Sequence, residues 1–305
     1  MKMKKQILTT TLIFLTSVIY GQTKTPTIES GIRIQHTEFI PYDYSRRVTD
    51  ADPYWGIKVN KLRNNTKTIN PFFLIYKNFE KGFSLEVDYS KIQIERANYD
   101  TDFILENQIS RRKNYSINNE RSDLKFNAYF HPNQQFSELF AFGLGIRKID
   151  RIRNASDLNY SIEEKFISLG PQIVFKSKIP ITEQLSFNLG IDLYHTQGKR
   201  HYNYSSLFYS PSDNYSYVET VKGNGNTIGI FRGFETNLSL KYNFLENFNI
   251  AIGYNYNYSY LKYENLNDFR YYSTSIYRTI EIQNTKYSNG KELIRGFFIS
   301  ASTVF

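Results

Sequence analysis

Apolar side chains recur at every second position along much of this chain, and this alternation constrains the fold more than any other feature. It is clearest in residues 140–146, 185–193 and 248–258, where the intervening positions are small or polar. A β-strand points successive side chains to opposite faces, so a period of two predicts strands with one apolar face. Strands that pass between lipid and a lumen need this pattern.

Weaker segments follow the same rule near residues 32–34, 72–76, 83–89, 124–130, 167–175 and 234–242. Counting segments of the ~9–11 residues that a tilted membrane strand requires gives about ten strands, with about eight or twelve as alternatives. The 17% aromatic content also suits strands.

The connections between these segments alternate in length. Short ones fall near residues 79–82, 131–137, 179–184 and 244–247, and long ones near residues 41–68, 95–121, 151–160, 197–227 and 263–291. Short periplasmic turns at one rim and long extracellular loops at the other are the layout of an outer-membrane barrel. We therefore predict an all-β fold, a transmembrane antiparallel up-and-down β-barrel.

The N-terminus has the layout of a secretory signal peptide. Lys2, Lys4 and Lys5 precede an apolar stretch that starts at Ile7 and ends before Gly21. This stretch is shorter than the ~20 residues of a spanning helix, which disfavours a retained anchor. We predict a signal peptide over residues 1–21 and one barrel domain over residues 22–305, although Ile19 departs from the small-residue rule for cleavage.

The composition excludes several kinds of site. Cysteine is absent, which removes disulfides, thiolate metal sites and cysteine nucleophiles. No phosphate-binding loop, dinucleotide fingerprint or metal-ligand spacing occurs, so we expect no cofactor. The net charge of +9 suits outer-membrane lipid and lipopolysaccharide as partners, and no Lys/Arg run is dense enough to indicate nucleic acid.

The final segment, residues 296–305 with the sequence GFFISASTVF, ends in Phe305. Here the chain resembles the bacterial outer-membrane β-barrel class, whose members typically end in an aromatic-terminated strand read by the assembly machinery. The resemblance implies an outer-membrane location and an interaction of the C-terminal strand with the barrel-assembly machinery. A soluble secreted β-sandwich is the alternative.

Charged residues occur at several inward positions of the predicted strands. By parity these are Glu86, Asp88, Lys125, Arg147, Lys176, Asp192, Glu235 and Lys241. Both signs are present and an unpaired charge in a confined space is costly, so we expect a paired network in the lumen. A barrel of about ten strands is only slightly wider than the eight-stranded barrels that side chains fill. A narrow ion path or an acid/base pair is the alternative.

His195 and His201 are candidate catalytic groups. Asp192 and His195 are similar to the Asp and His of the omptin proteases, which are also ten-stranded barrels with a site near the outer rim. Parity places Asp192 inward and His195 outward, and only Asp50 and Asp52 offer a second carboxylate pair. A lipid-modifying enzyme needs a Ser or Thr nucleophile near a His, and His201 and Ser205 are near each other in sequence. Neither pair is specific enough to predict a catalytic site.

Two of the predicted loops are rich in tyrosine, at Tyr202, Tyr204, Tyr209, Tyr215, Tyr217, Tyr271 and Tyr272. Tyrosine suits interaction surfaces because its ring is large and its hydroxyl remains hydrated. Alternatively, these segments are strands that continue past the membrane. The favoured function is a non-enzymatic barrel whose loops bind an extracellular or periplasmic ligand, in adhesion, envelope assembly or transport. A hydrolase with a site at the extracellular rim and a narrow channel are the alternatives.

Overall fold

The computed structural model describes residues 27–42, 47–49, 55–63, 66–78, 82–105, 108–132, 139–157, 160–210, 215–223, 226–245, 247–265, 269–273, 278–282 and 287–305. The predicted signal peptide lies outside these ranges, as do Asp50 and Asp52. Within them, no helix is long and apolar enough to cross a membrane.

Ten of the described strands form the wall of a barrel. They are β1 (Thr27–Ile40), β4 (Thr66–Asn78), β5 (Phe83–Leu105), β6 (Gln108–Phe130), β7 (Phe140–Asp157), β8 (Tyr160–Pro180), β9 (Leu185–Ser210), β11 (Ile228–Leu245), β12 (Phe248–Glu264) and β15 (Tyr287–Val304). Five shorter strands extend it: β2 (Arg47–Thr49), β3 (Trp55–Arg63), β10 (Tyr215–Gly223), β13 (Phe269–Ser273) and β14 (Arg278–Ile282).

The wall is antiparallel throughout and closes on itself. Neighbours in the sheet are neighbours in sequence apart from the short strands, β11 pairs with β9, and β15 returns to β1. Closure removes the exposed sheet edge, which lipid cannot hydrogen-bond. The predicted up-and-down barrel and its count of ten wall strands are confirmed.

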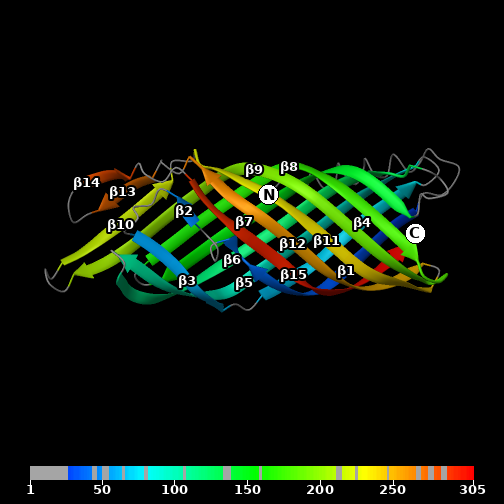
Figure 1. Ribbon diagram of the computed structural model, residues 1–305, viewed down its shortest axis with the longest axis horizontal. Helices are drawn as coiled ribbons and strands as arrows, with labels where there is room; N and C mark the ends of the chain where they lie inside the picture. Colours follow the sequence, from blue (N-terminus) through cyan, green and yellow to red (C-terminus); the bar gives the residue numbers. More distant parts are fainter. Residues whose placement is uncertain are drawn as a thin grey trace.

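The two ends of the barrel differ. At the terminal end, Ile28 and Phe305 exchange two backbone hydrogen bonds of 3.1 and 2.8 Å. The turn there between β4 and β5 contains Gly82, whose φ of 67° favours glycine. At the opposite, extended end, β10 pairs with β9 and β13 (Figure 1).

Strands occupy much of what the sequence suggested as long loops. The β5–β6 ladder continues to Leu105 opposite Gln108, and the β7–β8 ladder continues to Asp157 opposite Tyr160. Strand β9 continues to Ser210 and there pairs with β10. The sequence left two interpretations of the tyrosine-rich segments open, and their backbone forms strands that continue past the barrel.

The outer face carries an apolar band with a charged border. The outward apolar run from Leu185 to Leu193 spans about 26 Å of strand, or roughly 20 Å along the axis at a tilt of about 40°. This height is near the ~25 Å band of membrane barrels. Toward the extended end the band gives way to outward ion pairs: Lys91–Glu120 at 2.6 Å, Lys148–Asp150 at 2.7 Å and Arg295–Glu38 at 2.6 Å.

Candidate functional site

The charged residues singled out by parity line the barrel interior. Glu86, Asp88, Lys125, Arg147 and Glu235 are buried, and Lys176, Asp192 and Lys241 are partly exposed. They come from six different strands, β5, β6, β7, β8, β9 and β11. Antiparallel pairing brings them to similar heights: Asp88 lies opposite Lys125, and Asp192 lies opposite Glu235.

A continuous chain of ion pairs crosses the middle of the lumen. Lys125 contacts two carboxylates, Asp192 at 3.2 Å and Glu235 at 2.8 Å. Arg147 joins Glu235, at 2.8 Å, to Asp123, which also accepts from Arg121 at 2.8 Å. We call the whole set, which Glu292 and Arg151 complete, the central ion-pair chain: Arg151, Glu292, Arg121, Asp123, Arg147, Glu235, Lys125 and Asp192.

The central ion-pair chain is balanced in charge. Its four cations, Arg121, Lys125, Arg147 and Arg151, meet the four carboxylates of Asp123, Asp192, Glu235 and Glu292. Amide groups add hydrogen bonds to this chain: Asn255 and Asn257 donate to Glu235 at 2.9 and 3.1 Å, and the Tyr194 hydroxyl in turn donates to Asn257 at 2.7 Å. Buried charges are tolerated when paired and hydrogen-bonded in this way.

Toward the terminal end a second cluster surrounds Glu29. Its carboxylate contacts Lys77 at 2.9 Å and Lys241 at 2.5 Å, and Ser302 donates to it at 2.8 Å. Lys176 pairs with Glu86 nearby. Of the predicted lumen charges, Lys241 and the Lys176–Glu86 pair therefore belong to this end, whereas Asp88 lies 4.0 Å from Arg33.

Toward the extended end, aromatic rings fill the lumen. Beyond β1 the chain turns inward at Tyr42, whose ring meets Tyr263 edge-on at 5.6 Å and lies 4.6 Å from the Arg151 guanidinium carbon. The surrounding buried cluster comprises Tyr42, Ile149, Phe166, Tyr194, Phe231, Leu261 and Tyr263. Glu164 lies beside it, with Arg200 at 2.7 Å and the Tyr263 hydroxyl at 2.9 Å. An apolar layer thus borders the central ion-pair chain.

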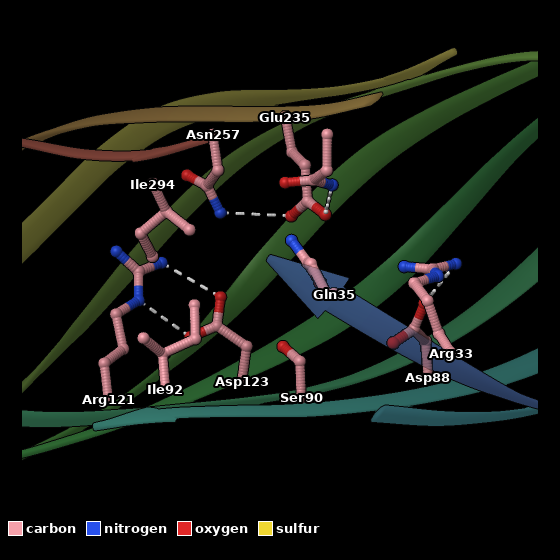
Figure 2. A pocket seen from close by; sticks show the side chains of 11 residues that line it. Arg33, Gln35, Asp88, Ser90, Ile92, Arg121, Asp123, Glu235, Asn257 and Ile294 are labelled. Carbon is pink, nitrogen blue, oxygen red and sulfur yellow. Dashed lines mark hydrogen bonds and ion pairs between the residues drawn. The ribbon is translucent and has the colours of Figure 1, made fainter. Parts of the chain in front are cut away.

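A small cavity remains beside the central ion-pair chain. Its wall includes Gln35 from β1, Ser90 and Ile92 from β5, and Asn255 from β12. Figure 2 shows the Arg121–Asp123 and Arg33–Asp88 pairs on either side of Gln35 and Ser90. The space admits about one or two water molecules. This volume is too small for a ligand much larger than water.

The structure does not bring the considered catalytic pairs together. Asp192 contacts Lys125 inside the lumen, whereas His195 faces outward and accepts a hydrogen bond from Arg232 Nε at 3.2 Å. Ser205 Oγ lies 2.9 Å from Ser161 Oγ, and His201 is instead the register partner of Lys165. In the described ranges, no group of three or more acidic, His or Cys residues could hold a metal ion.

One Ser–His contact was missed by the sequence reasoning. Ser84 Oγ lies 3.0 Å from His131 Nε2, and both side chains are buried at the terminal end. His131 was assigned to a turn, so its proximity to the β5 position Ser84 had no sequence signal. The contact joins β5 to the residue that directly follows β6, its partner in the sheet.

Several lumen residues were also missed because strands were ended too early. Arg121 and Asp123 precede Lys125 with the same parity, and Arg151 follows Arg147 with the same parity. The signal was present: continuing the period of two beyond the apolar outer face would have found these three residues. Glu292 lies beyond the start that was assumed for the last strand.

The loop tyrosines are partly described. The Arg200 guanidinium lies 4.3 Å from the centre of the Tyr202 ring, a cation–π contact. Tyr204 and Tyr271 are both register partners of Val221 in β10. Strands β9, β10 and β13 also contain Tyr209, Tyr215, Tyr217 and Tyr272. For these four residues, and for Tyr204 and Tyr271, the structure describes the backbone and not the side chain.

Comparison with known proteins gives one family match. The family described as "Predicted outer membrane protein, Leptospiraceae" matches residues 24–305. A search of curated proteins finds no match.

Solved structures with a similar fold include three outer-membrane proteins. The outer membrane protease OmpT from Escherichia coli is 11% identical, with a TM-score of 0.51 over 93% of this chain and 99% of OmpT. The toluene transporter TodX from Pseudomonas putida is 9% identical, with a TM-score of 0.33 over 92% and 90%. OprG from Pseudomonas aeruginosa is 8% identical, with a TM-score of 0.29 over 94% and 99%. The likeness to OmpT shows a shared barrel fold and nothing about activity.

Proposed function

We propose that this chain, which belongs to the family of predicted outer-membrane proteins of Leptospiraceae, is a non-enzymatic barrel that binds a ligand through its extended end. The chain is a bacterial outer-membrane β-barrel protein. The observation that carries the proposal is the filled lumen of the described part: buried side chains of the central ion-pair chain and the aromatic layer occupy it, and the cavity beside the chain has room for about one or two waters.

A filled lumen argues against transport through the barrel. A conducting path would have to displace buried arginines such as Arg121 and Arg147, which are 1% and 0% exposed. Separating such pairs leaves uncompensated charges in a confined space, which costs several kcal/mol. We therefore expect the function to lie at a surface of the protein. The extended end, where the strands project, offers a larger surface than the terminal end.

The extended end projects well past the charged border. From Lys91 at that border, β5 continues to Leu105, which corresponds to about 45 Å of strand. Strands β9, β10 and β13 build a second projection that contains most of the candidate tyrosines. With short turns in the periplasm, this end lies outside the cell. Stiff strands that present tyrosine suit recognition because little conformational entropy is lost on binding.

The register allows the β9–β10 part of this projection to be removed. Asn203 and Lys222 are cross-strand partners, so residues 204–221 can be replaced by Asn-Gly, which forms a two-residue hairpin turn. This removes Tyr204, Tyr209, Tyr215 and Tyr217. The control joins Ala97 to Ile117, also partners, through the same turn and trims the β5–β6 projection instead.

Binding of the purified protein to intact cells, a glycan array and envelope fractions is then measured. We expect the 204–221 replacement to lose binding and the 98–116 replacement to keep it. Unchanged binding by both variants, each with an intact heat-modifiable barrel, would refute a role for the tyrosine-rich projection.

The Ser84–His131 contact supports a second candidate, a hydrolase with its site at the terminal end. A nucleophile and a base within 3.0 Å are the minimum for acyl transfer. The test is release of product from ester and peptide substrates by refolded protein. Activity that disappears in Ser84→Ala but survives in Ser205→Ala would favour this candidate, and no activity in the refolded protein would eliminate it.

A further inference from the structure

One side of the outer face changes from apolar to basic within a single step of register. Across β9, β11, β12 and β15, one row of outward positions consists of Leu193, Phe234, Tyr258 and Leu293. The next row toward the extended end consists of His195, Arg232, Tyr260 and Lys291, and the row after it of Gln197, Ile230, Lys262 and Asn289. The apolar band therefore ends here at a row that carries two cations.

No position in these three rows is acidic, although three are cationic: Arg232, Lys262 and Lys291. Lys262 is itself paired with Glu264 of the following row, at 2.7 Å. Arg232 instead donates through Nε to the imidazole of His195. The row that borders the apolar band thus carries two exposed cations, Arg232 and Lys291, at the positions that flank Tyr260.

The spacing of these two cations suits a phosphate group. Arg232 and Lys291 are both register partners of Tyr260, one on each side. Two strand spacings separate their backbones by about 10 Å, and both side chains are exposed and long enough to converge over the Tyr260 ring. A guanidinium and an ammonium can then contact one anion together, with the tyrosine hydroxyl as an additional donor.

We propose that Arg232, Tyr260 and Lys291 form a binding site for a lipid phosphate at the edge of the bilayer. The apolar row of Leu193, Phe234, Tyr258 and Leu293 directly beneath contacts the acyl chains of the same lipid. Cations at the border of an apolar band lie at the level of the lipid headgroups. At the extended end of an outer-membrane barrel, the phosphorylated lipid of that leaflet is the glycolipid anchor of lipopolysaccharide. This site is independent of the ligand proposed for the tyrosine-rich projection.

The test measures binding of diphosphoryl lipid A to the refolded protein in detergent micelles by native mass spectrometry. The variant is the double substitution Arg232→Gln and Lys291→Gln, which removes both charges, keeps a polar side chain at each position and leaves the lumen unchanged. We expect its affinity to fall roughly thirtyfold, because each basic residue near an anionic lipid surface contributes about fivefold. Lys91→Gln, on β5 and outside this surface, is the matched control and should bind as the unchanged protein does.

Three further arms identify the ligand. The swap Arg232→Lys with Lys291→Arg should retain most of the affinity, and dephosphorylated lipid A should bind the unchanged protein as weakly as diphosphoryl lipid A binds the Gln variant. Millimolar inorganic phosphate should not compete. Equal binding by the Gln variant, an equal loss in Lys91→Gln, equal binding of dephosphorylated lipid, or displacement by free phosphate would each overturn the proposal. Unboiled gel mobility verifies that every variant is folded.

Discussion

Replacing Asp123 with Asn tests whether the central ion-pair chain supports the barrel. Asp123 accepts hydrogen bonds from Arg121 at 2.8 and 2.9 Å and from Arg147 Nε at 3.0 Å. The substitution keeps the shape of the side chain and removes its charge. The chain would then hold four cations against three carboxylates.

The expected loss in the free energy of unfolding depends on which ion pairs Arg121 and Arg147 keep after the substitution. Removing one partner of a buried ion pair costs about 3–5 kcal/mol. Arg121 still contacts Glu292 and Arg147 still contacts Glu235, each at 2.8 Å, so neither cation is left alone. We therefore expect a loss near the lower limit, about 3 kcal/mol in the free energy of unfolding.

The control is Glu38→Gln, the same chemical change in the exposed pair of Glu38 with Arg295, whose side chains are 47% and 44% exposed. An exposed pair contributes little to stability, because water and salt screen its two charges. Unfolding in urea is followed by the fraction that keeps the unboiled gel mobility. The reasoning is refuted if Asp123→Asn is within about 1 kcal/mol of the unchanged protein, or no less stable than Glu38→Gln.

Three other outcomes are expected. Gly82→Val should lower stability by about 1–2 kcal/mol in the same assay, because a φ of 67° forces its Cβ against backbone, and Gly82→Asn should lose less. Tyr42→Ala should cost about 3–5 kcal/mol by emptying a fully buried site, whereas Tyr42→Phe, which keeps the ring, should cost less than half of that. If the assembly machinery reads Phe305, Phe305→Ala should slow assisted folding into vesicles while leaving spontaneous folding in detergent unchanged; equal rates in both assays would contradict this.

The sequence predicted the barrel because its outer face obeys a local rule. Alternation from Leu185 to Leu193 and from Phe248 to Tyr258 is imposed by lipid on one side and the lumen on the other, so each strand can be identified without its neighbours. The same rule assigned Lys125 and Glu235 to the interior. The outward residues beside Arg121 are polar, so the apolar period does not extend to Arg121 and the sequence predicts a loop there.

Partner identity could not be predicted, because it depends on register across the whole barrel. Glu235 meets Lys125 and Arg147 across the lumen from β6 and β7, two strands that are not its neighbours in the wall. A shift of one residue in the register of any strand pair between them would change which charged side chains meet across the lumen. The inward turn at Tyr42 and the Ser84–His131 contact are likewise set by tertiary packing rather than by periodicity.

The most direct test of a lumen filled by the central ion-pair chain and the aromatic layer is single-channel recording in planar bilayers, with insertion verified by the heat-dependent band shift. The account predicts that the inserted protein produces no unitary conductance steps, because buried charged and aromatic side chains of the described residues occupy the lumen. Regular ohmic steps from the unchanged protein would contradict it and would establish a channel instead.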